Sequence, residues 1–222
     1  MRLFDLGIVD FNAAWQLQKN IFSQVRENDF SAAVILCRHH PVITLGRNTK
    51  KDNILAGEET LRQNSIALYK VERGGDATYH GIGQLTAYPI LNLHYFKKDI
   101  NWYLRKLEDI IISCLSDFGV RGEKRKDLTG VWVEGKKIAS IGIAIKQWIT
   151  FHGLSINISS GDLENFRFIR PCGMDIEMTS LESVLGRPVS IEDVKLNLIL
   201  KFQEARREDG KSCSAGIRRR DN

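Results

Sequence analysis

The sequence predicts an α/β fold of the α+β kind, in which helices flank a mixed and largely antiparallel sheet. Short apolar segments with strand character are interspersed with segments of helical periodicity over the first 200 residues. Between residues 131 and 158, three strand-like segments follow one another with only short turns between them, as antiparallel strands do. The mixture of such hairpins with intervening helices favours a mixed sheet.

The composition is that of a globular protein. The chain has 222 residues, 43% of them hydrophobic, which is enough for one sizeable core and argues against a disordered or fibrous protein. No apolar run approaches the ~18 residues of a membrane span. The N-terminus carries Asp5 and Asp10 and lacks a basic segment ahead of an apolar stretch, so it is interpreted as the first element of the fold and not as a leader. We therefore expect a cytoplasmic protein without a membrane segment.

The first half of the chain predicts one helix and several strands. Asp10 can cap a helix whose apolar residues recur at helical spacing up to Val25. Residues 32–37 form an apolar run suited to a buried strand, Pro41 interrupts it, and residues 42–45 resume a strand. A further strand is expected over residues 66–71.

Four of the twelve residues from Arg73 to Gln84 are glycines. This content predicts an ordered loop with unusual backbone dihedral angles or a close approach of the backbone to another group. A strand follows over residues 85–93, and residues 101–118 form the clearest amphipathic helix. Thr179-Ser180-Leu181-Glu182 has capping-box spacing, with Thr179 three residues before Glu182, and predicts a short helix that ends near Gly186.

A last helix is predicted to begin at Ser190 and to end near Ala205. The chain then becomes basic, and much of its net charge of +5 lies there. We expect one domain over residues 1–205 and a basic, disordered tail over residues 206–222. The tail could attract acidic partners, but no nucleic-acid-binding signature accompanies it, so nucleic acid is not expected as a partner.

Four cysteines are present, at positions 37, 114, 172 and 213. They form no CxxC pair and match no zinc spacing, so we expect free thiols and no metal site. Cys37 and Cys114 lie within apolar patterns and fit buried structural roles, while Cys213 lies in the polar tail. Cys172 follows a proline and precedes a glycine whose N–H could serve as half of an oxyanion hole, although a Pro-Cys-Gly segment alone equally fits a buried thiol.

A nucleophilic cysteine needs a neighbouring base or positive charge, because a thiol with a pKa of about 8.5 is mostly protonated at neutral pH. The candidates are His80, His152, Lys136 and Lys137, and spacing alone does not choose among them. Either histidine could equally be a satisfied structural residue. The pair Gly81-x-Gly83 matches neither the P-loop nor the dinucleotide fingerprint, so nucleotide binding is only weakly indicated.

Several segments together resemble the lipoyl(octanoyl) transferase family. They are residues 40–47 (HPVITLGR), 73–85 (RGGDATYHGIGQL), 135–142 (GKKIASIG), 151–157 (FHGLSIN) and 171–173 (PCG). The likeness covers roughly residues 1–200 in the family's order, and these motifs in one order and spacing are far more specific than any one alone. The chain departs from the family at Ile82, where a proline is often found; this makes the loop less rigid but removes no chemical group.

The resemblance implies a biotin/lipoate protein ligase-like catalytic domain and an acyl-enzyme mechanism. Cys172 would take an octanoyl (or lipoyl) group from acyl carrier protein as a thioester and pass it to a lysine of a lipoyl domain. Lys137 would promote the thiolate, acting as a base when its amine is neutral, the form that burial among apolar groups favours. The acceptors would be lipoyl domains of 2-oxoacid dehydrogenases and the glycine cleavage H protein. The enzyme would be a monomer and would need no cofactor.

The same resemblance implies the substrate-contacting residues. They are Arg73, Gly74, Gly75, Asp76, Ala77, Thr78, Tyr79, His80, Ser140, Ile141, Gly142, Gly153, Leu154 and Ser155. His152 is added as a neighbour that would shape the pocket or take part in acid–base chemistry.

Two alternatives remain at this point. An ATP-dependent lipoate or biotin protein ligase would share the fold but would need no nucleophilic cysteine, so Pro171-Cys172-Gly173 speaks against it. A non-catalytic module that binds acyl carrier or lipoyl domains is the second alternative, and the retained motifs speak against that one.

Overall fold

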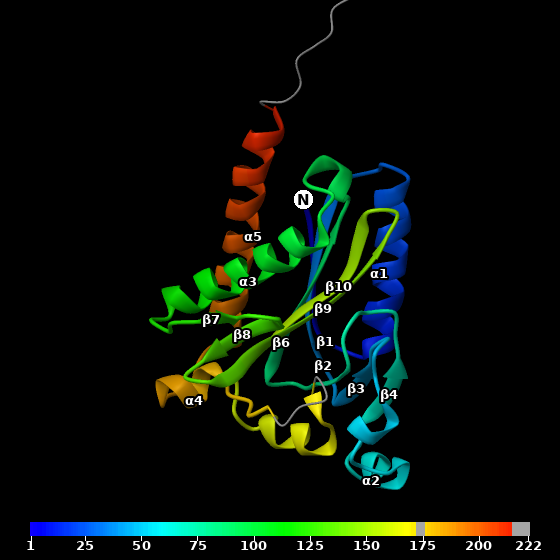
Figure 1. Cartoon of the computed structure of the whole chain (residues 1–222), viewed down its shortest axis with the longest axis vertical. Coiled ribbons are helices and arrows are strands. Elements are labelled where there is room, and N and C mark those ends of the chain that lie inside the picture. Colours follow the sequence, from blue (N-terminus) through cyan, green and yellow to red (C-terminus); the bar gives the residue numbers. More distant parts are fainter. Residues whose placement is uncertain (172–175, 215–222) are drawn as a thin grey trace, which may run out of the picture.

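The chain folds into two sheets that helices cover. The computed structural model describes residues 1–171 and 176–214, with side chains up to residue 208. The larger sheet has seven strands in the order β1-β2-β6-β10-β9-β8-β7, and the smaller has three in the order β4-β3-β5. Strand β1 pairs with β2 in parallel and the remaining pairs of the larger sheet are antiparallel, so the predicted mixed, largely antiparallel sheet is confirmed (Figure 1).

The larger sheet contains β1 (Arg2–Val9), β2 (Ala32–His39), β6 (Gln84–Leu91), β7 (Glu123–Arg125), β8 (Leu128–Val133), β9 (Lys136–Lys146) and β10 (Ile149–Asn157). The smaller sheet contains β3 (Val42–Leu45), β4 (Ala67–Lys70) and β5 (Ala77–His80). The α-helices are α1 (Phe11–Arg26), α2 (Glu58–Gln63), α3 (Ile100–Asp117), α4 (Leu181–Leu185) and α5 (Ile191–Ser214). Three 3-10 turns, η1 (Lys51–Asn53), η2 (Leu93–Tyr95) and η3 (Leu163–Phe168), complete the described elements.

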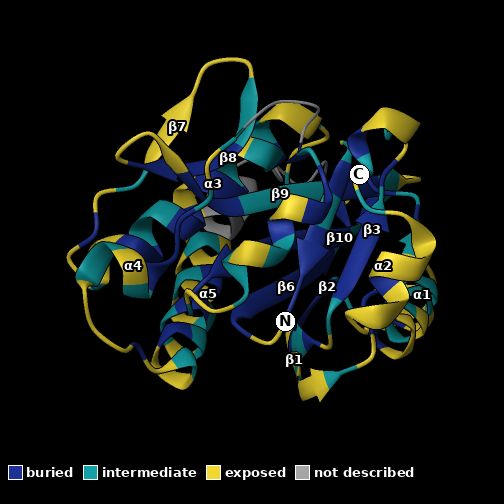
Figure 2. Cartoon of the chain, turned by 90° about the horizontal axis from the view of Figure 1, so that it is seen from below, coloured by how far each residue is buried: buried dark blue, intermediate teal, exposed yellow. Residues whose placement is uncertain are grey.

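Apolar residues of the larger sheet pack on both of its faces. On one face, Ile111 and Leu115 of α3 and Leu198 of α5 pack against β6, β8, β9 and β10. On the other, the buried stripe of α1, represented by Ile21 and Val25, packs against β2 and β6. Strands such as β2 and β6 are therefore buried along almost their whole length (Figure 2). This arrangement explains why their sequences are nearly continuous apolar runs.

The meander predicted between residues 131 and 158 is confirmed as β8, β9 and β10. The helix expected over residues 101–118 is α3, and the predicted start of α5 is confirmed, since Ser190 Oγ accepts the N–H of Asp193. The short helix α4 is also present, but its cap is Ser180, whose Oγ accepts the N–H of Ser183, and not Thr179, one residue earlier, as the capping-box spacing indicated. Asp10 precedes α1 as expected, but its side chain makes no capping hydrogen bond.

Two boundary predictions are wrong. The segment from residue 73 to 84 is not loop throughout, because residues 77–80 form β5 and pair with β3. The last helix does not end near Ala205 but continues to Ser214. Arg206, Arg207 and Glu208 are strong helix formers and can continue the helix, although Gly210 and two serines follow them. Residues 215–222 and the predicted nucleophile Cys172 lie outside the described residues.

The cap of α4 gives a test of the fold. Replacing Ser180 by alanine removes the acceptor for the Ser183 N–H in a fully buried position, so we expect a loss of ~1 kcal/mol in the free energy of unfolding. Urea denaturation followed by circular dichroism measures it. Ser116→Ala, at an exposed site in the last turn of α3, is the matched control and should unfold as wild type. An equal effect of both variants would contradict the cap.

Candidate active site

A cavity of ≈ 390 Å³ lies where the larger sheet, the smaller sheet and α3 meet. One part of its wall is apolar and includes Leu104 of α3, Leu128 of β8 and Leu154 of β10. Another part is polar and includes Thr44 of β3 and Thr86 of β6. The cavity therefore combines an apolar wall with a set of hydrogen-bonding groups, as small-molecule sites do.

The structure brings the sequence-predicted residues together at this cavity, with two exceptions. The described ones that line it are Arg73, Gly74, Gly75, Asp76, Ala77, Thr78, His80, Lys137, Ser140, Ile141, Gly142, His152, Gly153, Leu154 and Ser155. The first exception is Cys172, whose placement is not described, although Pro171 directly before it lines the cavity.

The second exception is Tyr79, which does not line the cavity. Its ring packs against Phe166, with ring centroids 5.6 Å apart, and its hydroxyl accepts a hydrogen bond from Asn165 Nδ2 at 2.9 Å. Successive residues of a strand point to opposite faces, so Tyr79 points away from the cavity that its neighbours Thr78 and His80 line.

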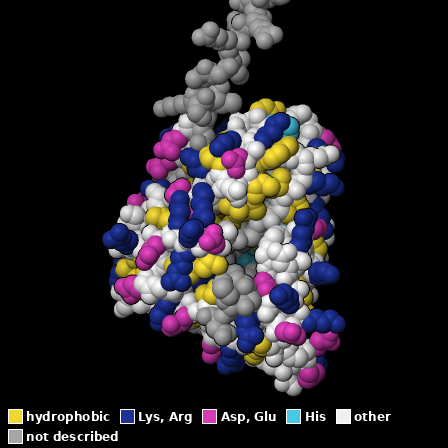
Figure 3. Space-filling model, in the orientation of Figure 1, with side chains coloured by type: hydrophobic (Ala, Val, Ile, Leu, Met, Phe, Trp, Pro, Cys, Tyr) yellow, Lys and Arg dark blue, Asp and Glu magenta, His cyan; other side chains and the backbone are white. Residues whose placement is uncertain are grey.

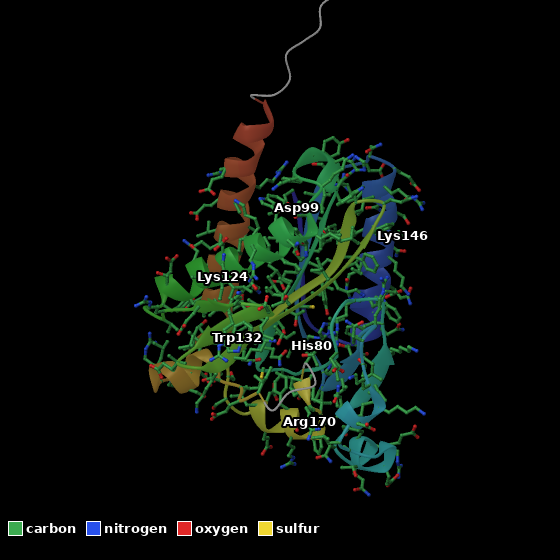
Figure 4. All side chains as sticks on the ribbon, viewed as in Figure 1. His80, Asp99, Lys124, Trp132, Lys146 and Arg170 are labelled. Atoms are coloured by element: carbon green, nitrogen blue, oxygen red, sulfur yellow. The ribbon has the colours of Figure 1, made fainter. Side chains whose placement is uncertain are left out.

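Lys137 is the second residue of β9, and only 3% of it is exposed. Its main chain is held on the side away from β8, because its N–H donates to Glu177 O and its carbonyl accepts the N–H of Thr179. The side chain runs across Trp132, with Nζ 5.2 Å from the ring centroid. Figure 4 labels Trp132 of β8 and His80 of β5. The Lys137 amine is thus buried at the cavity wall, over an aromatic face.

Lys136 has a different environment. Its side chain is 45% exposed and pairs with the Glu177 carboxylate at 2.5 Å. Because adjacent strand residues alternate between faces, only one of the two lysines can point into the cavity, and that residue is Lys137.

His80 is buried and its Nδ1 lies 3.2 Å from Gln84 Oε1. Burial, together with the nearby His39 and Arg73, lowers the pKa of His80 to about 3. The ring is therefore neutral at neutral pH. A base with so low a pKa holds a proton poorly, so His80 is better suited to a neutral hydrogen-bonding role.

His152 is buried in the cavity wall with a positive φ of 56°. Its Nε2 lies 3.3 Å from Glu72 Oε2, which also accepts the indole N–H of Trp15. Burial outweighs the attraction of Glu72 and lowers the pKa of His152, so the neutral ring donates its Nε2–H to the carboxylate. This bond lowers the pKa of Glu72 to about 2. The contact fixes both the ring's orientation and its tautomer.

Arg73 shapes the cavity. Its guanidinium donates to the carbonyl and hydroxyl oxygens of Thr44 and to Gly74 O. Gly74 N donates to Ile143 O, which ties the same loop to β9. A Cβ on Gly142 would lie 2.9 Å from Arg73 Cδ, so the approach of loop and strand requires glycine at that position. The loop that lines the cavity is therefore fastened to both sheets.

A second polar network lies behind the cavity. His39 Nδ1 donates to Val9 O, so its Nε2 accepts the hydroxyl proton of Tyr88 at 2.7 Å. Burial lowers the pKa of His39 to about 4, and burial raises the pKa of the neighbouring Cys37 thiol. Cys37 and Cys114 are buried free thiols, as expected. No group of His, Cys, Asp or Glu among the described residues could hold a metal ion.

Other lining residues were not predicted from the sequence. This group consists of Phe11, Thr44, Thr86, Tyr88, Ile100, Leu104, Asp127, Leu128, Thr129, Ile143 and Pro171. Thr44 belongs to the segment 40–47, and Pro171 precedes the predicted nucleophile. Both therefore lie within sequence motifs that could have identified them as lining residues. The residues of α1, α3 and β6 reach the cavity only through tertiary packing, which no local pattern encodes.

Comparisons with known proteins identify the family of this chain. Residues 10–203 match the lipoyl protein ligase A/B catalytic domain family. An octanoyltransferase of Solibacter usitatus is 41% identical over 86% of this chain and 86% of its own length. One of Pelobacter propionicus is 40% identical over 91% of this chain and 94% of its own. The chain belongs to the octanoyltransferase family. It is therefore an acyltransferase that acts in protein lipoylation.

Solved structures show the same fold. A lipoate-protein ligase A bound with ATP superposes with a TM-score of 0.74 and 17% identity, covering 96% of this chain and 92% of that one. A biotin protein ligase from Aquifex aeolicus, in complex with biotin and ATP, gives a TM-score of 0.60 and 13% identity over 95% and 72%. The expected biotin/lipoate protein ligase-like fold is confirmed. Of the helices in the described part of the enzyme, none is long and apolar enough to cross a membrane.

The buried histidines predict how stability depends on pH. The pKa values of His39 and His80 are lowered from 6.5 in the folded enzyme, so the unfolded chain binds protons first as pH falls. The free energy of unfolding should decrease from about pH 6.5 toward pH 4. His39→Gln should flatten this dependence by about 1.4 kcal/mol per pH unit between about pH 6 and 4.5, because one proton-binding site is lost.

Urea unfolding at several pH values measures the slope. His94→Gln, at an exposed position of η2, leaves the buried pair intact and should keep the wild-type slope. If His39→Gln also kept it, His39 would not be a buried neutral residue.

Proposed function

We propose that the enzyme takes an octanoyl group from acyl carrier protein, holds it as a thioester on Cys172, and delivers it to a lysine of a lipoyl domain. The observation that carries this proposal is the shared cavity of Lys137 and Pro171, since Pro171 is bonded to Cys172. Membership of the octanoyltransferase family supports the acyl group, and the apolar wall of the cavity supports a hydrocarbon substrate.

The proposed reaction has two transfers. In the first, the Cys172 thiol gives its proton to the Lys137 amine, the thiolate attacks the carrier thioester, and the carrier leaves as a thiol after taking a proton. In the second, the ε-amine of the acceptor lysine attacks the Cys172 thioester, forms an amide and releases the Cys172 thiol. No ATP is required, because the donor thioester is already activated and the product amide is more stable.

The octanoyl chain would lie against the apolar wall. The apolar lining of the cavity includes Ile100 and Leu104 of α3 and Ile141 and Leu154 of the larger sheet. Burying each methylene contributes ~0.8 kcal/mol, so an eight-carbon chain gains several kcal/mol of binding from this surface. The loop that Arg73 fastens would contact the polar end of the acyl group, and His152 would help to shape it.

The face that carries α3 and β7 would receive the partner proteins. Lys and Arg side chains gather there (Figure 3), and the residues of β7, including Lys124 and Arg125, are exposed. Acyl carrier and lipoyl domains are generally acidic, so complementary charge would aid docking. The acceptors proposed are lipoyl domains of 2-oxoacid dehydrogenases and the glycine cleavage H protein. The enzyme would act as a monomer in the cytoplasm, where a reducing environment keeps the Cys172 thiol free.

The acyl-enzyme is directly testable by intact mass spectrometry. Wild-type enzyme exposed to octanoyl-acyl carrier protein without ATP should gain one octanoyl group on Cys172, whereas Cys172→Ala should gain none and lose transfer by at least about 10²-fold. Cys114→Ala removes a buried thiol and is the control that should still be acylated. A requirement for ATP, or an adduct on another residue, would contradict the mechanism.

The role of Lys137 is tested separately. Lys137→Ala should slow formation of the acyl-enzyme at neutral pH by about 10²–10⁴-fold, because the thiol loses its proton acceptor. Stopped-flow or quench-flow acylation measures this rate. Lys136→Ala, at the exposed neighbouring position, should acylate at the wild-type rate. A wild-type rate in Lys137→Ala would transfer the role to His80 or His152.

A further inference from the structure

A fully buried carboxylate lies next to the candidate active site without lining it. Glu108 of α3 is 0% exposed and does not belong to the cavity wall in the described part of the chain. Its Oε2 accepts a hydrogen bond from Arg105 Nη1 at 2.6 Å, and Arg105 is 45% exposed. Glutamate is almost never completely buried without a specific use for its charge or its hydrogen bonds.

The second bond of Glu108 reaches β8. Its Oε1 accepts the main-chain N–H of Gly130 at 3.1 Å. Gly130 has φ +137°, and just beyond it the register between β8 and β9 shifts between Val131 and Trp132. The carboxylate therefore anchors the strand where its geometry is irregular.

Gly130 lies against the side chain of Lys137. A Cβ at position 130 would be 2.7 Å from Lys137 Cε and 3.3 Å from its Nζ. The main chain at Gly130 thus forms one wall of the space that holds the lysine amine. The ring of Trp132, which pairs with Lys137 across the two strands, lies along the same side chain. A shift of Gly130 would move this wall and, with it, the position of Nζ.

We infer that Glu108 is a positioning residue for the Lys137 amine, acting through the backbone of Gly130. This inference rests on the proposed function of Lys137 and adds a residue outside the cavity to its machinery. The carboxylate holds the N–H of Gly130, the glycine backbone confines Cε and Nζ, and the amine is kept at the cavity wall. Arg105 balances the buried charge and connects it to solvent.

Positioning the Lys137 amine and stabilising the fold are two different roles for Glu108, and they have different measurable effects. If Glu108 only tied α3 to β8, its loss would lower the melting temperature without a specific effect on the step that uses Lys137. If it positions the amine, its loss lowers kcat and leaves KM nearly unchanged, because the cavity wall that binds the acyl group is intact. A displacement of about 1 Å at a catalytic group can reduce the rate by about 10²-fold.

Two substitutions at position 108 and one control make the test. Glu108→Ala removes the acceptor for the Gly130 N–H, and we expect kcat to fall about 10- to 100-fold with KM within about twofold of wild type. Glu108→Gln keeps an oxygen acceptor and should lose less than about fivefold, since a neutral acceptor makes the same bond more weakly. Glu59→Gln changes an exposed carboxylate of α2, which pairs with Arg62 and lies outside the proposed docking face, and should retain the wild-type rate.

The alanine substitution is then repeated in the Lys137→Ala enzyme, where the residual acylation rate is followed. With the amine absent, Glu108→Ala should change that rate by less than about twofold, because there is nothing left to position. Equal losses in Glu108→Gln and Glu108→Ala, an unchanged rate in Glu108→Ala, or a full additional loss in the double variant would each overturn the inference. If Lys137→Ala alone kept the wild-type rate, the proposed function of Lys137 would fail instead, whatever Glu108 did.

Discussion

Burying the Lys137 amine at the cavity wall removes it from water, and the rest of the site depends on how the fold meets this desolvation cost. Lys137 is 3% exposed, and its position is fixed by strand pairing on both sides of β9. The ring of Trp132 gives the amine an aromatic face in place of water. Gly130 gives it space that any other residue would occupy. The chain thus surrounds one polar group with rigid elements, an arrangement that would hold the proposed proton acceptor in one position.

The two sheets divide the remaining tasks. The larger sheet supplies Lys137 and, with α3, the apolar wall, while the smaller sheet carries the loop that Arg73 fastens to Thr44. Because Arg73 donates to three main-chain and side-chain oxygens around it, its charge serves mainly to hold the loop. The two cavity histidines are buried with lowered pKa values and are therefore neutral at neutral pH. Neither ring would compete for a proton at neutral pH, which is consistent with the proton exchange proposed for Lys137.

Local patterns predicted most of the fold because its strands and helices carry strong periodicity. The meander, α3 and the serine cap of α5 follow from nearest neighbours in the sequence. Strand β5 was missed because four residues in a glycine-rich segment become a strand only by pairing with β3, which is more than thirty residues away. The apolar wall from α3 was missed for the same reason: Leu104 looks like any core residue until the helix is docked.

The burial of Glu108 is the feature that its sequence neighbours predict least well. A glutamate beside Asp109 and three residues after Arg105 has the pattern of a solvated helix surface, and Asp109 does lie there. Glu108 is buried instead because α3 crosses β8 where the N–H of Gly130 leaves the strand ladder and requires an acceptor. An unpaired buried N–H costs more than the bond itself contributes, so the fold retains a charged residue in its interior. A fold does not by itself determine a reaction, so the chemistry depends on which side chains the scaffold positions and not on the sheet itself. A carboxylate outside the cavity can therefore matter to the reaction as much as a residue that lines it.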